Sequence, residues 1–141
     1  MATLLAHIQT FPGKETDFEK IMSEMYRDTH ATEPDCLRYE YWRGEARGFY
    51  YCLLSFKDNI AFWNHQASDH HERNMPNFAA CIEDLKLEIL DPVSSASPLP
   101  AASGQQLPVD ASDAVKKQAQ QVPVKLASWW LQQAQSHRDS Q

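Results

Sequence analysis

Phe49-Tyr-Tyr-Cys-Leu-Leu-Ser-Phe56 is the stretch of this 141-residue chain that decides its fold. Aromatic and aliphatic residues fill it, and a short run of that composition is typical of a buried β-strand. Just upstream, Cys36–Arg43 alternates apolar and polar residues, which indicates a second strand. Residues 44–48 begin and end with glycine, so the two strands are predicted to form a hairpin.

Periodic segments continue on both sides of this hairpin. Residues 3–10 alternate as a strand, and residues 14–32 carry one apolar stripe at helical spacing. Downstream, two short helical stretches are predicted at Asn59–Gln66 and at residues 69–82, with Pro76 near the start of a turn in the second. Residues 85–90 alternate again and predict the last strand.

The resulting order, β-α-β-β-α-β, predicts an α+β fold of the ferredoxin-like, split βαβ type. Helices cover one face of such a sheet and leave the other bare, and exposed apolar surface costs on the order of 25 cal/mol per Å². A second copy that covers the bare face would close two sheets into one α/β barrel, so we expect a homodimer. The polar side of the first strand, with His7 and Gln9, would then point into the barrel.

Charge and composition exclude several classes of partner. The formal net charge is −6, and no basic patch is present, which argues against nucleic acid and anionic membranes as partners. The three cysteines, Cys36, Cys52 and Cys81, are widely spaced in apolar surroundings and predict free thiols in a reducing compartment. Neither a signal peptide nor a membrane-spanning stretch is visible, so a cytoplasmic protein is expected.

Composition changes after residue 91 and suggests three parts. Residues 1–91 form the predicted barrel domain, residues 92–109 are a linker rich in proline, alanine and serine, and residues 110–141 form a helical arm. Asp110 is expected to cap the first helix of the arm, with a second helix at residues 124–137.

The second helix of the arm carries the adjacent Trp129 and Trp130, which present too much apolar area to leave in water. We therefore expect the arm to dock on a barrel, with the partner's barrel favoured, where it could cover the mouth of the pocket. The alternative is a disordered tail with an exposed apolar end.

Histidines gather in residues 62–71, Phe-Trp-Asn-His-Gln-Ala-Ser-Asp-His-His. His65 and His70 flank a Ser68-Asp69 break, which predicts that one histidine ends a short helix and the other begins the next. Two imidazoles that face one space are able to move protons near neutral pH. The alternative is that both are solvated residues at a helix junction.

Several motifs, taken in order, resemble the antibiotic biosynthesis monooxygenase family. They are Thr-Leu-Leu-Ala-His-Ile-Gln-Thr-Phe-Pro-Gly-Lys from residue 3, Glu-Pro-Asp-Cys-Leu-Arg-Tyr-Glu from residue 33, Ser-Phe-Lys-Asp-Asn from residue 55, and His65-x-x-Ser-x-His70. The resemblance covers about residues 2–91 and implies a small dimeric α+β barrel. One departure concerns the third strand, where members commonly have a glutamate and then an aromatic two residues on. Leu54 and Phe56 occupy those places here.

The resemblance implies oxygenation of a small aromatic hydroquinone or a polyketide-like phenol by dioxygen, without a cofactor or metal. His65 and His70 match the family's junction and are the predicted proton-transfer residues, and His7 is a further candidate from inside the barrel. Trp63, Trp42 and Tyr51 are candidate pocket walls. Arg38 would either hold an anionic oxygen or pair with Glu40 on the strand surface.

Other functions on the same barrel stay open. An isomerase or lyase would use the same histidines without oxygen, and a non-catalytic ligand-binding protein would not need the missing glutamate. A haem-degrading relative is disfavoured, because the asparagine, tryptophan and histidine set of that subgroup has no clear match. A metal site built from His65, Asp69 and His70 is also disfavoured.

Overall fold

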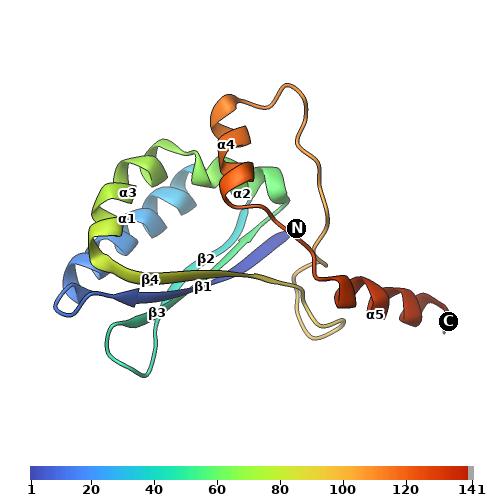
Figure 1. The fold of residues 1–141 in the computed structure, drawn as a ribbon, viewed down its shortest axis with the longest axis horizontal. Helices are drawn as coiled ribbons and strands as arrows, with labels where there is room; N and C mark the ends of the chain where they lie inside the picture. The colour runs from blue at the N-terminus through green and yellow to red at the C-terminus, as the bar shows by residue number, and fades with distance from the viewer. Residues whose placement is uncertain (140–141) are drawn as a thin grey trace.

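The computed structural model describes residues 1–139, with side chains described up to residue 133 (Figure 1). Within that range the chain forms four strands and five helices. In order they are β1 (Ala2–Thr10), α1 (Glu15–Thr32), β2 (Cys36–Arg43), β3 (Phe49–Phe56), α2 (Asn59–Gln66), α3 (Asp69–Cys81), β4 (Ile82–Leu90), α4 (Asp113–Gln121) and α5 (Ser128–Asp139).

The four strands form one antiparallel sheet in the order β2-β3-β1-β4. This arrangement, with two helical segments between the strand pairs, confirms the ferredoxin-like α+β prediction. The expected hairpin turn joins β2 to β3. It closes with a 2.7 Å hydrogen bond from the Gly44 amide to the Phe49 carbonyl, and it needs a positive φ of 83° at Gly48, which glycine adopts without strain.

Alternation along the central strands separates the two faces of the sheet. The inner face lies under α1 and α3 (Figure 1), where Leu4, Ala6 and Ile8 of β1 are buried with Phe18 and Met22 of α1. The outer face carries Leu5, His7, Trp42, Tyr51 and Leu53, and Trp42 is 59% exposed. Tyr51 is also exposed, at 39%, whereas Leu5 and Leu53 are half-buried.

Two details of α3 and β4 differ from the sequence expectations. Pro76 lies inside α3 rather than at a turn, and the helix continues around it to Cys81. The strand begins at once with Ile82, three residues before the alternation that predicted it. Ile82 pairs with Thr10 across a register shift, and such an irregularity hides the strand's first residues from a period-two pattern.

The arm also differs from its prediction. Ser112, not Asp110, caps α4, since its hydroxyl accepts a 3.2 Å hydrogen bond from the Val115 amide. The second helix begins at Ser128 rather than at residue 124.

Figure 1 shows α4 resting beside α2 of its own chain, where the sequence argument had favoured the partner's barrel. The Trp63 indole donates a 2.9 Å hydrogen bond to the Val122 carbonyl, and Gln105 Oε1 accepts from the first two amides of α2, those of Asn59 and Ile60. Trp129 at the start of α5 is 59% exposed.

The three cysteines are free thiols, as predicted. None of the described helices combines the length and the apolar character needed to cross a membrane.

Candidate functional site

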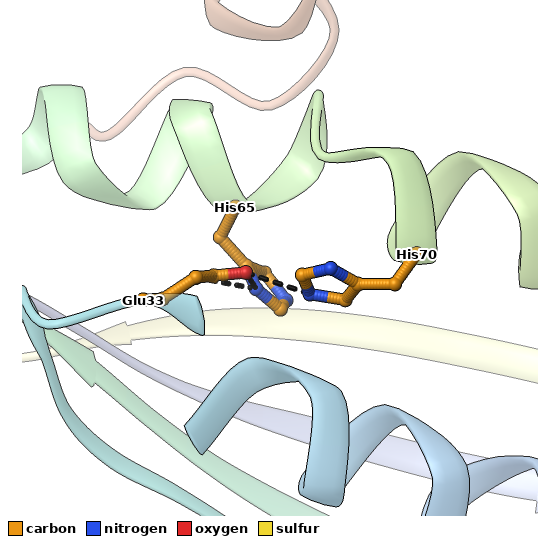
Figure 2. Close-up of side chains that lie close together, drawn as sticks. All are labelled: Glu33, His65 and His70. Carbon is orange, nitrogen blue, oxygen red and sulfur yellow. Dashed lines mark hydrogen bonds and ion pairs between the residues drawn. The ribbon is translucent and has the colours of Figure 1, made fainter. Parts of the chain in front are cut away.

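One carboxylate and two imidazoles meet between the C-terminal end of α1 and the α2–α3 junction (Figure 2). The Glu33 carboxylate contacts His65 Nδ1 at 2.9 and 3.0 Å and His70 Nε2 at 2.8 Å. The side chains of His65, His70 and Glu33 are only 1%, 10% and 16% exposed. We call these three residues the Glu33 cluster.

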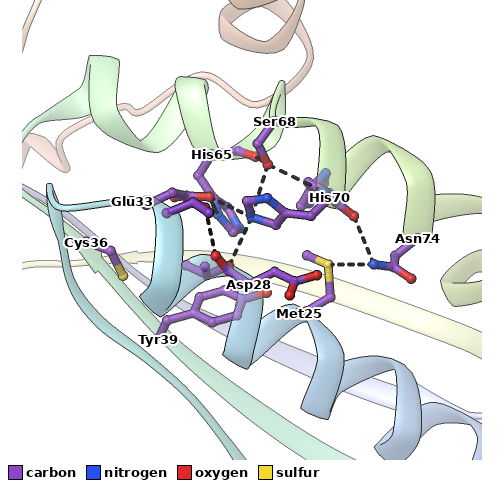
Figure 3. Close-up of polar contacts among 12 residues, drawn as sticks. Met25, Asp28, Glu33, Cys36, Tyr39, His65, Ser68, His70 and Asn74 are labelled. Atoms are coloured by element: carbon purple, nitrogen blue, oxygen red, sulfur yellow. Dashed lines mark hydrogen bonds and ion pairs between the residues drawn. The ribbon is translucent and has the colours of Figure 1, made fainter.

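Local sequence explains how the cluster is positioned. Glu33 is the C-cap residue of α1, and its amide still donates to the Thr29 carbonyl, so its side chain leaves the helix at a fixed point. Ser68, the residue after the C-cap of α2, is the N-cap of α3. Its hydroxyl donates to the His65 carbonyl at 2.7 Å and lies 3.3 Å from His70 Nε2 (Figure 3). The His-x-x-Ser-x-His spacing thus turns both imidazoles toward one carboxylate.

Hydrogen bonding determines which nitrogen of His65 carries the proton. An ionised carboxylate only accepts, so Glu33 holds the proton of neutral His65 on Nδ1. His65 Nε2 is then an acceptor, and it is buried without a hydrogen-bond partner. The rings of Tyr39 and Phe56 pack against the imidazole, with centroids 4.9 and 5.1 Å away. His65 is therefore held in one orientation with a free lone pair.

A cavity of about 90 Å³ lies between the inner face of the sheet and the helices, and His65 forms part of its wall. Most of the wall is apolar and includes Ala6, Ile8, Met22, Leu54, Phe78 and Leu87. Two phenols, Tyr39 and Tyr41, add a hydrogen-bonded pair with 2.8 Å between their oxygens. Burial raises the pKa of both phenols well above their usual value, so they stay neutral.

His71 is a second imidazole on the cavity wall, with its ring centroid 5.1 Å from that of His65. Burial, with smaller contributions from the nearby His65 and His70, lowers the pKa of His71 to about 3. His71 is accordingly neutral at physiological pH. Its Nδ1 is buried and has no hydrogen-bond partner.

The structure separates the residues that the sequence analysis had grouped as a site. His7 lies on the outer face of the sheet, 2.9 Å from Glu88, and its ring contacts that of Tyr51. Trp42 also lies on the outer face, and Arg38 pairs with Glu40 at 3.4 Å, which was the surface alternative.

Trp63 is buried, but it faces the arm rather than the cavity. His65 and His70 come together at Glu33, on the inner side of the sheet where the cavity lies. His7, Trp42 and Tyr51 instead lie together on the outer face.

Glu33, Tyr39, Tyr41 and His71 were missed. Glu33 was read only as the end of a helix, although a charged residue just past an amphipathic helix and just before a strand is well placed to reach the next helix layer. Glu33 also replaces Asp69 in the group able to hold a metal ion. The ligand atoms of Glu33, His65 and His70 all lie within 4.8 Å of one another.

Comparison with known proteins points to one family. A family model described as antibiotic biosynthesis monooxygenase matches residues 1–76. A putative antibiotic biosynthesis monooxygenase from Caulobacter crescentus shares 24% sequence identity with a TM-score of 0.63, covering 66% of this chain and 90% of that one.

A protein from Pseudomonas aeruginosa shares 22% identity with a TM-score of 0.61, covering 66% of this chain and 94% of that one. A putative antibiotic biosynthesis monooxygenase from Nitrosomonas europaea shares 13% identity with a TM-score of 0.62, covering 66% and 99%. At these identities the structural likeness shows the fold alone. The comparison with curated proteins gives no match.

Proposed function

Because this chain belongs to the antibiotic biosynthesis monooxygenase family, we propose that it oxygenates a small single-ring hydroquinone or phenol with dioxygen, with His65 as the base. One observation carries this proposal. His65 lines the cavity, its Nε2 is buried without a hydrogen-bond partner, and Glu33 holds the other ring nitrogen. A carboxylate that orients an imidazole in this way also stabilises the imidazolium that forms when the ring takes a proton.

The chemistry needs no other electron source. His65 Nε2 removes the proton of a substrate hydroxyl, and the resulting anion is a better reductant for dioxygen than the neutral substrate. For a hydroquinone, one oxygen atom enters the ring as a new oxygen substituent and the other leaves as water. The substrate supplies all four electrons and becomes a hydroxyquinone, and the proton held on His65 is available for the departing oxygen.

The cavity restricts the substrate in size and charge. A cavity of roughly 150 Å³ has been found to hold benzene, so a space of about 90 Å³ suits one ring at most, and only if side chains shift. Met22, Met25 and Met75 line it, and methionine adapts its shape readily. Lys and Arg are absent from the described lining residues, which disfavours substrates with a carboxylate or phosphate.

The place of the family's strand glutamate supports the same assignment. Leu54 lines the cavity where that carboxylate would stand, whereas Glu33 approaches His65 from the end of α1. In this chain the Glu33 carboxylate would thus act on the substrate only through His65, which it contacts. We assign Glu33 and His70 as positioning residues, and His65 as the residue that contacts substrate.

The outer face of the sheet completes the proposal. It presents exposed Trp42 and Tyr51 beside half-buried Leu5 and Leu53, so we propose that a second copy packs there. In such a homodimer each chain would keep its own cavity, because the cavity lies on the opposite side of the sheet.

Oxygen uptake by the full-length protein, with a panel of single-ring hydroquinones, catechols and monophenols, tests the reaction. We expect uptake with at least one compound, and product that carries one ¹⁸O atom from ¹⁸O₂. Loss of a substrate proton to solvent deuterium without oxygen uptake would instead support an isomerase or lyase. Binding with neither outcome would support a non-catalytic ligand-binding protein.

A further inference from the structure

We propose that the Glu33 cluster is also a binding site for one divalent first-row transition metal ion, and that the bound ion stops His65 from acting as a base. The binding itself stands on the geometry of the cluster. The effect on catalysis rests on the function proposed above.

The ligand atoms already have the spacing that a shared metal ion requires. Metal–nitrogen and metal–oxygen bonds of about 2.0–2.1 Å put neighbouring ligand atoms about 2.9 Å apart at right angles and about 3.3 Å apart in a tetrahedral site. Glu33 Oε1 lies 2.9 Å from His65 Nδ1 and 2.8 Å from His70 Nε2 (Figure 2). Exchange of the shared protons for a metal ion therefore needs little movement of these side chains.

Ligand chemistry indicates the class of ion. Two imidazoles and one carboxylate suit Zn²⁺, Fe²⁺, Co²⁺ or Ni²⁺, whereas Mg²⁺ and Ca²⁺ prefer oxygen ligands throughout. Three protein ligands leave positions for water. The hydroxyls of Thr29 and Ser68 each lie 3.3 Å from His70 Nε2 and are close enough to hold such a water (Figure 3).

Burial of the cluster is deep but incomplete, so an ion has a way in. Glu33 is 16% exposed and His70 is 10% exposed, whereas His65 at 1% is the innermost ligand. A divalent ion held by one carboxylate and two neutral imidazoles gives a net local charge of only +1. A single carboxylate partner makes that charge less costly to bury.

Occupation of the site changes what His65 offers to the cavity. A metal ion takes the lone pair of Nδ1, and the ring proton must then reside on Nε2. The ring nitrogen without a partner, on a residue that lines the cavity, then becomes a donor instead of an acceptor. No electron is transferred in this step, and the substrate hydroxyl simply loses its base.

The chain contains a matched control for this site. His7 and Glu88 form another histidine–glutamate pair at 2.9 Å, with side chains 37% and 46% exposed. Among the described residues, no third possible metal ligand lies close enough to this pair to complete a three-ligand site. It shares the chemistry of one imidazole and one carboxylate but not the three-ligand geometry.

Titration of the metal-free full-length protein tests the binding. We expect calorimetry with Zn²⁺, and absorption spectra with Co²⁺, to show one ion per chain. Glu33→Gln and His70→Gln should each weaken binding at least tenfold, whereas His7→Gln should leave it unchanged. Absence of one-to-one binding, or equal weakening by His7→Gln, would overturn the proposal.

A measurement on the unmutated chain avoids any question about variant folding. In ¹⁵N spectra of the histidine rings, Zn²⁺ should move His65 Nε2 from the unprotonated to the protonated range, and bound Zn²⁺ without this change would refute the proposed site. Zn²⁺ should also reduce oxygen uptake in proportion to occupancy; unchanged uptake at full occupancy would refute the inhibitory role. Lack of any oxygen uptake would count against the proposed function, while the ring spectra would still decide the metal site.

Discussion

Two histidine–glutamate pairs in this chain have the same 2.9 Å contact but opposite surroundings. His65 and Glu33 lie between the sheet and the helices with side chains 1% and 16% exposed. His7 and Glu88 lie on the outer face with side chains 37% and 46% exposed. The inner imidazole is further fixed by two aromatic rings, while water has access to the outer one.

The difference shows that the surroundings, not the contact, decide what such a pair does. An exposed ion pair is worth about 0–1 kcal/mol, because water and salt screen it. In the protein interior the dielectric constant is lower, so the interaction between a carboxylate and its partner is stronger. Removal of the partner then leaves a buried charge unpaired and lowers the stability of the fold more. The inner pair also has a buried nitrogen without a hydrogen-bond partner, Nε2 of His65, and this residue lines the cavity.

The largest expected effect is on turnover. His65→Ala should lower the rate of oxygen uptake by roughly 10²-fold or more, the scale of lost general acid–base catalysis. His7→Ala, measured in the same assay, should change the rate less than about twofold. Since the sequence made His7 a candidate, a large loss in that variant would move the base to the outer face. His65→Asn serves as a second variant if the alanine change lowers the thermal midpoint strongly.

The outer face should respond in assembly rather than in chemistry. Leu53→Arg places a charge in the middle of that face and should shift a dimer to monomers in light scattering, whereas Val109→Arg, at a linker residue that is 95% exposed, should not. A mass near 16.2 kDa for the unmutated protein at micromolar concentration would contradict the dimer itself.

Stability should distinguish the two carboxylates. Glu33→Gln replaces an acceptor shared by two buried imidazoles and should lower the free energy of unfolding by about 1–3 kcal/mol. Glu88→Gln should stay within about 0.5 kcal/mol, as is usual for surface changes. Urea denaturation of both variants provides the measurement. If both lose the same free energy of unfolding, burial does not make the Glu33 contact more stabilising than the Glu88 contact.

A smaller effect is expected at the start of α2, the helix that carries His65. Gln105→Ala removes the acceptor of two amides and should cost about 1 kcal/mol, the usual scale of a helix cap. The thermal midpoint should fall by roughly 2–6 °C. Gln106→Ala, at an exposed neighbour, should leave it unchanged. If Gln105→Ala and the unmutated protein had the same thermal midpoint, the linker contact would not stabilise α2.

Sequence patterns predicted the sheet well because strand alternation and glycine turns are local properties. The Cys36–Arg43 and Phe49–Phe56 hairpin and the helix break at Ser68 are of this kind. Glu33 was not predicted as a site residue, because its partners come from helices more than 30 residues later and only tertiary packing brings them together. His7 was predicted to line a pocket on the outer face of the sheet. The cavity lies instead on the inner face, where its lining includes the small Ala6 and the flexible Met22.

The contact of Gln105 with α2 also affects the rate of amide hydrogen exchange at the start of this helix. The amide protons of Asn59 and Ile60 are held by a side chain that lies more than 40 residues further along the chain. They exchange with solvent deuterium only when that side chain departs, so their exchange rate reports how often this part of the linker leaves α2. Hydrogen exchange at these two amides thereby measures the opening rate of the linker around Gln105, a segment outside the residues 1–76 that the family model matches.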